Sequence, residues 1–390
     1  MSYPVSPLVT RVEAPPIAEA MSWVRQGPRN RDLINLCQAV PSYPPAEELQ
    51  QEFGRIAMQP STGGYTDIYG LPALRAAYAA HVSADYRADI PADHVALTTG
   101  CNQAFAAAVM AVAKAGDDVV IPVPYYFNHQ MWLTMLGIGM RTIPAFADGR
   151  AYPSPEDAAA AIGPNTKAIV LCTPNNPTGA VYPADVLGAF FELAKARGLA
   201  LILDETYKDF RPDPAPAHGL FQRPDWHLTL IQLYSFSKVY ALAGYRLGAM
   251  TAGPDILAEA AKILDCMTIC PPQITQQGVI YALRELDTWK RGKLEMMAQR
   301  LAAIRSAFSR KGLDYKLISS GAYFAYVRHP FGGQASKAVA MRLAQEHDVL
   351  CLPGSMFGPG QEDYLRIAFA NVDASLMEPL VDRLIATQGP

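Results

Sequence analysis

Three short apolar runs have the length and composition of strands that are buried on both faces. They are Val119–Pro122, Ala168–Cys172 and Ala200–Leu203. Strands of a parallel sheet covered by helices form continuous apolar runs, whereas half-exposed strands alternate between apolar and polar residues. Helical patterns separate the three runs. The pattern therefore predicts an α/β fold in which helices wrap a mostly parallel sheet.

The pattern changes after the proline pair at 271–272. A long helix-prone stretch extends to about Arg310, and Tyr315–Ile318 and Ala322–Val327 then alternate like antiparallel strands. The first 45 residues or so are proline-rich and lack clear periodicity, which is typical of a segment lying across another surface. We expect an amino-terminal arm that helps to close a site, a large domain and a smaller α+β domain. Their ranges are 1–45, 46–275 and 276–390.

Polar residues follow two of the buried runs. Ala168–Cys172 leads into a proline-rich turn that contains Asn176, and Ala200–Leu203 leads into Asp204 and Tyr207. Open α/β sheets bind ligands at the carboxyl ends of their strands. We therefore expect the side chains of Asn176 and Asp204 to lie close together and near that of Lys238.

Lys238 lies between two small hydroxyls and an arginine, in the order Ser235, Ser237, Lys238, Arg246. A lysine amine is nucleophilic only when neutral, and a nearby cation or loss of water lowers its pKa. The guanidinium of Arg246 suits a phosphate dianion, to which both serines can also donate hydrogen bonds. The segment indicates a lysine that condenses with a carbonyl beside a phosphate site. Taken alone, it also fits a solvated surface lysine.

In this order the motifs resemble the class I and II aminotransferases, which are pyridoxal-phosphate (PLP) enzymes of fold type I, over nearly all 390 residues. The resemblance implies amino transfer from an L-amino acid to a 2-oxo acid by a ping-pong PLP mechanism. Lys238 would carry the cofactor and Asp204 would pair with its pyridinium nitrogen. Asn176 and Tyr207 would hydrogen-bond its phenolic oxygen. A carboxylate beside the ring nitrogen keeps that nitrogen protonated, so the ring can act as an electron sink.

Other cofactor contacts are implied nearer the amino end. Val95–Thr99 is predicted to be a strand leading into a helix whose first backbone N–H groups would bind the phosphate. These groups belong to Gly100, Cys101 and Asn102. A simple strand-to-helix turn is the alternative. Tyr126 is implied to stack on the ring, with Tyr125 as the other candidate. His129 either packs beneath the cofactor or is a core histidine.

The resemblance also implies contacts with the substrate and with a partner chain. Arg366 would clamp the α-carboxylate near Asn176 and Ala39. Many relatives have glycine in place of Ala39, and alanine disfavours positive φ, so this loop must be ordinary or strained. Tyr65 would cross a homodimer interface to the partner's phosphate, or else be an ordinary loop tyrosine. Asp265 lies near the position where aspartate-specific relatives have an arginine. It either disfavours aspartate or lies on a solvated helix face.

Rival functions use related scaffolds. A PLP-dependent β-lyase acting on sulfur amino acids would need the same residues. A non-catalytic ligand sensor would require a further module, which this length does not accommodate. A nicotinamide-dependent dehydrogenase would need a Gly-x-Gly-x-x-Gly turn after a strand, and none is present.

The composition is typical of a globular protein, and chemistry on small molecules is the expected kind of function. The 33 lysines and arginines against 36 aspartates and glutamates give a net charge of −3 without a basic stripe, so neither nucleic acid nor membrane is an expected partner. The six cysteines are scattered, which favours reduced thiols. Cys266 and Cys270 would share a helix face, but no histidine accompanies them, and no metal is expected. Because no signal peptide or long apolar run is present, we expect a cytoplasmic protein.

Overall fold

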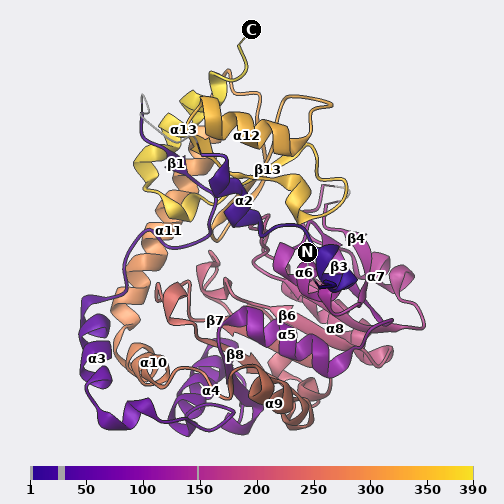
Figure 1. The fold of residues 1–390 in the computed structure, drawn as a ribbon, viewed down its shortest axis with the longest axis vertical. Helices are drawn as coiled ribbons and strands as arrows, with labels where there is room; N and C mark the ends of the chain where they lie inside the picture. Colours follow the sequence, from indigo (N-terminus) through magenta and orange to yellow (C-terminus); the bar gives the residue numbers. More distant parts are fainter. Residues whose placement is uncertain (1–2, 25–30, 147–148, 390) are drawn as a thin grey trace.

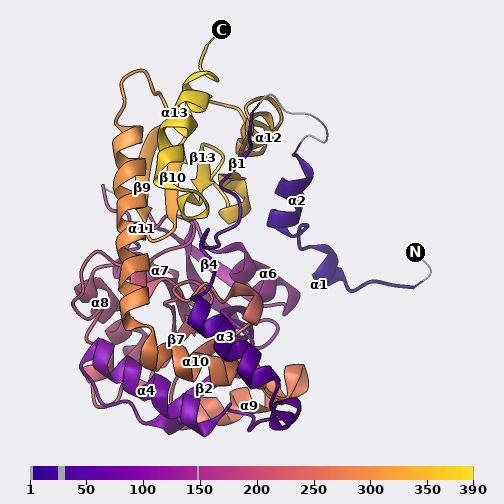
Figure 2. The same ribbon diagram turned by 90° about the vertical axis from the view of Figure 1, so that its left-hand side faces the viewer.

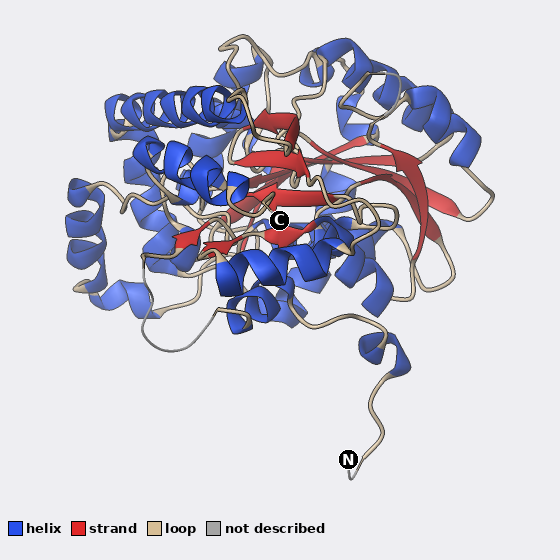
Figure 3. Cartoon of the chain, turned by 90° about the horizontal axis from the view of Figure 1, so that it is seen from above, coloured by secondary structure: helices blue, strands red, loops and turns tan. Residues whose placement is uncertain are grey.

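The computed structural model describes residues 3–24, 31–146 and 149–389, and its main feature is a seven-stranded sheet with helices on both faces (Figures 1 and 3). The strand order is β2-β8-β7-β6-β5-β3-β4. All neighbours pair in parallel except β8, which is antiparallel to both β2 and β7. The predicted α/β fold with a mostly parallel sheet is confirmed. The strands are β2 (Val95–Thr98), β3 (Asp118–Val123), β4 (Gly139–Pro144), β5 (Thr166–Cys172), β6 (Ala200–Asp204), β7 (Leu230–Ser235) and β8 (Gly248–Thr251).

Each inner strand buries alternate residues on opposite faces of the sheet. On β5, Ile169 and Leu171 pack on the same side as α4 and α8, whereas Ala168 and Val170 pack on the side of α5 and α9. Burial on both faces is why these strands form continuous apolar runs. Each fully buried leucine or isoleucine contributes about 2 kcal/mol. The helices that cover the sheet include α4 (Pro72–Tyr86), α5 (Cys101–Val112), α6 (Phe127–Met135), α7 (Pro155–Ala161), α8 (Ala184–Ala196) and α9 (Pro254–Thr268).

A second, four-stranded antiparallel sheet has the order β12-β13-β10-β9. The antiparallel strands expected near 315–327 are confirmed as β9 and β10. The helix-prone stretch before them is two helices that meet at Leu286, and the longer one, α11, extends beside both sheets (Figure 2). The elements of this part are α10 (Gln273–Glu285), α11 (Asp287–Phe308), β9 (Lys316–Gly321), β10 (Phe324–Arg328), α12 (Ser336–Glu346), β12 (Leu352–Pro353), β13 (Tyr364–Ile367) and α13 (Met377–Ile385).

The amino-terminal arm contains two short helices, α1 (Pro7–Thr10) and α2 (Pro16–Ser22). Residues before α1 extend away from the body of the molecule (Figures 2 and 3). Further along, β1 (Ile34–Asn35) pairs in parallel with β11 (Val349–Leu350), which joins the start of the chain to its carboxyl-terminal part.

The three expected domain ranges stay a prediction. The boundary at 275 falls inside α10, which packs against α4 and against α3 (Glu47–Ala57). Parts of the three ranges, at 1–2, 25–30, 147–148 and 390, lie outside the described residues. No described helix is long and apolar enough to cross a membrane.

The sheet topology brings several strand ends to one edge. Because β8 is antiparallel to both β2 and β7, the strands β2, β5, β6 and β7 all run in the same direction. The residues that follow their carboxyl ends therefore face a common region. The turn after β5 is pressed against the second sheet, since a Cβ atom on Gly179 would lie 2.4 Å from the backbone nitrogen of Gly321.

Candidate active site

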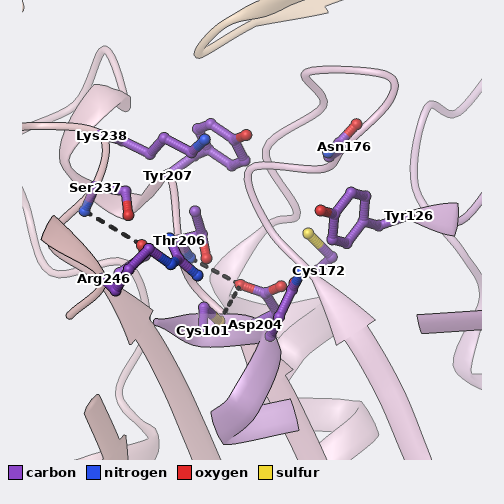
Figure 4. A pocket seen from close by; sticks show the side chains of 12 residues that line it. Cys101, Tyr126, Cys172, Asn176, Asp204, Thr206, Tyr207, Ser237, Lys238 and Arg246 are labelled. Carbon is purple, nitrogen blue, oxygen red and sulfur yellow. Dashed lines mark hydrogen bonds between the residues drawn. The ribbon is translucent and has the colours of Figure 1, made fainter. Parts of the chain in front are cut away.

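A cavity of about 110 Å³ lies at this edge of the sheet (Figure 4). The predicted site residues come together there from several strand ends, so the convergence expected of Asn176, Asp204 and Lys238 is observed. The lining residues are Cys101, Asn102, Tyr126, Cys172, Asn176, Asp204, Thr206, Tyr207, Ser235, Ser237, Lys238 and Arg246.

The Lys238 amine points into this cavity, and its Nζ donates a hydrogen bond to the carbonyl oxygen of Ala39 at 2.7 Å. Its backbone is held by Tyr323, whose hydroxyl donates to the Lys238 carbonyl oxygen at 3.1 Å. Burial, followed by the charges of Arg366 and Arg246, lowers the pKa of Lys238 from 10.5 to about 8. A large share of the amine is therefore neutral in mildly alkaline solution, as a nucleophile or base requires.

Asp204 is a buried carboxylate with donors on both oxygens. The Thr206 backbone N–H donates to Oδ1 at 2.9 Å, and the Cys101 thiol donates to the same oxygen at 3.6 Å. Nε2 of His129 lies 3.2 Å from Oδ2. Burial alone would raise the pKa of Asp204, but the hydrogen bonds and charge of His129, together with the bonds from Thr206, hold it below its usual range. The cavity thus contains a fixed negative charge.

The start of α5 forms the wall of an anion cradle. Gly100 has φ +82°, which favours glycine, and a Cβ atom there would lie 2.4 Å from Nη2 of Arg246 and displace the guanidinium. The Thr99 hydroxyl is buried and has no hydrogen-bond partner among the described residues. Backbone N–H groups at a helix start, the Arg246 guanidinium and the hydroxyls of Ser235 and Ser237 are a donor set that fits a phosphate dianion.

A second cavity of about 300 Å³ adjoins the first and contains Arg366. Nη1 of Arg366 donates to Oδ1 of Asn176 at 3.2 Å, and Nη2 donates to the Cys37 carbonyl. Its Nε has no partner in the described part of the chain. A buried cation with an unused donor is costly unless a ligand meets it. The guanidinium is therefore suited to a carboxylate.

Ala39 also lines this second cavity, and it is not among the residues with left-handed φ. Of the two expected outcomes for its loop, the ordinary conformation is therefore observed. Tyr126 lines both cavities. Tyr125 is instead packed in the core beside the sheet, so the structure favours Tyr126 as the ring-stacking candidate.

Two predicted residues lie away from both cavities. Tyr65 follows the short 3-10 helix at Pro60–Gly63 and is 80% exposed. Asp265 is exposed on α9, which agrees with the solvated-face interpretation. The roles implied for them, like those of the cavity residues, stay predictions.

The expectation that Cys266 and Cys270 share a helix face is wrong. α9 ends at Thr268, and Ile269 adopts φ +65°, which turns the chain out of the helix before the proline pair. Cys270 instead accepts a hydrogen bond from the Thr66 backbone N–H at 3.4 Å.

The sequence did not single out Thr206 or Cys172, and it left two interpretations open for His129. An aspartate side chain commonly accepts a hydrogen bond from the backbone N–H two residues on, so the contact of Thr206 could have been found. His129 is stacked on Phe105 at 4.0 Å between ring centroids while it contacts Asp204. It therefore lies behind the carboxylate. No local signal identifies that pairing, since 75 residues (204 − 129) separate the partners.

Comparison with known proteins agrees with this geometry. The family model for "Aminotransferase class I and II" matches residues 31–384. The chain is 29% identical to a valine–pyruvate aminotransferase of Mycobacterium tuberculosis over 379 residues, 95% of this chain and 96% of that protein. It is 28% identical to an aromatic aminotransferase, ISS1, of Arabidopsis thaliana over 358 residues, 90% of this chain and 88% of that protein. The fold matches the aspartate aminotransferase from Thermus thermophilus with maleate at a TM-score of 0.89 and 24% identity, covering 98% and 99% of the two chains.

Proposed function

Because the chain belongs to the class I and II aminotransferases, a family of PLP-dependent enzymes, we propose that Lys238, Asp204 and Tyr207 are its catalytic residues. The family defines the reaction, in which an amino group moves from an amino acid to a 2-oxo acid. One observation carries the assignment of roles. A lysine amine with a lowered pKa shares a cavity with a buried carboxylate and an anion cradle.

The donor set of the site fits PLP. When bound, PLP supplies an aldehyde and a ring that draws electron density from the α carbon of the substrate. The cradle at Gly100, Cys101 and Asn102, with Ser235, Ser237 and Arg246, would hold its phosphate. Asp204 would hold the ring nitrogen in its protonated form, and Asn176 and Tyr207 would donate hydrogen bonds to the phenolic oxygen. Tyr126 would cover one face of the ring.

Lys238 has two tasks in this proposal. Its neutral Nζ would hold the aldehyde of the cofactor, and when free it would act as a general base. Nζ then takes the proton from the α carbon of the substrate. Arg366, with Asn176 and the loop of Ala39, would orient the substrate through its α-carboxylate. Fixing this group aligns the α carbon with Nζ.

We further propose a homodimer in which Tyr65 reaches the phosphate of the partner chain. Tyr65 is 80% exposed and Met58, before the same turn, is 84% exposed, as expected of residues awaiting a partner surface. A cytoplasmic location is supported by the six cysteines, all of which are unpaired, because reducing compartments keep thiols free.

The test is covalent labelling followed by kinetics. Borohydride reduction of the holoenzyme should add a pyridoxyl group to the peptide of Lys238, and Lys238→Ala should abolish this mass. With two substrates varied, steady-state rates should give parallel lines, because each half-reaction is separate. Labelling of another peptide would overturn the assignment of Lys238. Ammonia and pyruvate released from cystathionine without a 2-oxo acid acceptor would instead identify a β-lyase.

A further inference from the structure

The larger cavity has two kinds of lining residue. The catalytic and anion-binding candidates Lys238, Arg246, Asn176 and Tyr207 line both cavities, and Arg366 lines the larger one. A second set lines only the larger cavity and comes from the arm helix α2, the loop after β1 and the first turn of α6. These residues are Ile17, Gln38, Val40, Phe127 and Asn128.

This second set contains apolar side chains and amides but no charge. Ile17 is half-buried and packs against the main core, and Phe127 belongs to that core. Among the described residues that line the larger cavity, none carries a carboxylate. A basic substrate side chain would therefore lose its hydration without gaining a counter-charge, which costs several kcal/mol.

The three cations of the cavity do not favour a dicarboxylic substrate either. Arg366 is already held by Asn176 and Cys37, and its remaining Nε is suited to the α-carboxylate. Arg246 belongs to the phosphate cradle and Lys238 supplies the reacting amine. A second, distal carboxylate on the substrate would therefore have to compete with the α-carboxylate for Arg366 or with the phosphate for Arg246.

The surface around Tyr65 contains exposed apolar side chains and the exposed carboxylates of Asp67 and Asp265. The loop of Thr66 contacts the end of α9, where Thr66 N–H donates to the thiol of Cys270 at 3.4 Å. Met267 and Ile269 beside it are 36% and 40% exposed. The segments 58–70 and 263–270 contain no lysine or arginine. If this surface faces the partner's site, as proposed above for Tyr65, it adds no cation that could pair with a distal carboxylate of the substrate.

We infer that the amino donor has an uncharged, apolar or aromatic side chain, which Ile17, Val40 and Phe127 contact, and that dicarboxylic and dibasic amino acids are poor donors. This inference rests on the proposed function, because it assumes that Arg366 binds the α-carboxylate. Ile17 then acts as a specificity residue supplied by the amino-terminal arm.

The experiment measures kcat/KM of the half-reaction, from spectral conversion of the holoenzyme, with single donors. Leucine, methionine and phenylalanine should exceed aspartate, glutamate and lysine by roughly 100-fold or more, since a charged side chain would be buried without a partner. A charged donor that equals or exceeds the apolar ones would overturn the inference and leave amino transfer standing. Conversion by no donor at all would instead contradict the proposed function.

Variants of α2 locate the contact. Ile17→Ala should lower kcat/KM for leucine and phenylalanine about 10-fold, the usual effect of removing a few methylenes from a contact. Ile17→Lys should raise the ratio of glutamate to leucine about 10-fold or more, a change that misfolding cannot produce. Met21→Ala, a truncation of a 46% exposed residue one turn further along α2, is the matched control and should change neither value. An unchanged preference in both Ile17 variants would remove Ile17 from the inference.

Discussion

At the scale of single residues, the site depends on buried charges that differ in how fully they are paired. Asp204 receives donors from Thr206, Cys101 and His129, so its negative charge is well satisfied. Lys238 and Arg366 differ, because each lies near other cations. The amine of Lys238 responds by losing its proton more readily, whereas an arginine stays charged and requires an anion.

The pKa of Lys238 gives a direct prediction for the cofactor-free protein. Acylation of Lys238, followed by mass spectrometry, should reach half its maximal rate near pH 8 and not near 10.5, because burial and two arginines disfavour the charged amine. Labelling of the exposed Lys262 in the same samples is the internal reference. A midpoint at the ordinary value would show that the amine is hydrated.

The same shift has a consequence for stability. Between about pH 8 and 10.5 the folded state has lost the Lys238 proton and the unfolded state has kept it. The folded state therefore binds fewer protons, and the free energy of unfolding rises with pH in this window. Relative to Lys238→Met, the cofactor-free wild type should become more stable across it, as measured by urea unfolding. Below about pH 8, this difference should be independent of pH.

The resemblance of the motifs to the class I and II aminotransferases predicted most of the cavity lining, and the residues themselves predicted that Asn176, Asp204 and Lys238 would lie together. Asp204 and Lys238 follow recognisable buried strands, and Gly100 precedes a helix, so their neighbourhood could be inferred. The donors behind Asp204 were not predictable in the same way. His129 comes from α6, and nothing in its local sequence distinguishes a histidine paired with a buried carboxylate from a core histidine.

At the scale of elements, the turn after β5 holds Asn176 in place because it is packed against the second sheet. Gly179 has φ +71°, and its Cβ position is 2.4 Å from Gly321 N and 2.5 Å from Gly321 O. Backbone atoms cannot move aside as flexible side chains do. The turn that contains Asn176 is therefore held against the backbone of the second sheet.

Gly179→Ala tests this contact against a matched control. Gly198 also has left-handed φ, +62°, but nothing lies within 4 Å of its Cβ position. Gly198→Ala should cost only the backbone term, about 1–2 kcal/mol. Gly179→Ala should lose a further ~1–3 kcal/mol through the clash, and urea unfolding with circular dichroism would measure both. Equal losses of unfolding free energy in the two variants would show that the backbone of Gly321 moves aside without an energetic cost.

Strands buried on both faces were predicted well because their apolar runs leave few alternatives. Helix ends were harder to predict. The pattern after 271 reads as one helix, yet α10 and α11 separate at Leu286, and α9 stops before Cys270. Where each helix ends depends on the part of the fold against which the next segment packs. The local sequence does not contain that information.

At the scale of the whole molecule, the larger cavity is built from segments far apart in the chain. Ile17 and Ala39 from the amino-terminal part meet Arg366 from the carboxyl-terminal part. The sequence predicted that the arm would close a site but could not identify Ile17. The pattern of apolar residues indicates local structure and does not show which distant segments contact each other. The exposed Tyr65 and the extended residues before α1 point outward from a single chain, so the complete site requires a second copy in our proposal.

Mixed dimers test whether Tyr65 acts across the interface. Tyr65→Phe removes one hydrogen bond to a charged group, about 1.5–3 kcal/mol, and should weaken PLP binding roughly 10- to 100-fold. Tyr3→Phe, at another exposed tyrosine, is the control. At limiting PLP, the Tyr65→Phe protein should be nearly inactive, and the Lys238→Ala protein should be inactive at any PLP concentration. In a hybrid of the two chains, the intact Lys238 meets an intact Tyr65 only if Tyr65 comes from the partner. Activity at limiting PLP should therefore return on mixing, whereas a tyrosine acting within its own chain would leave every site of the mixture defective.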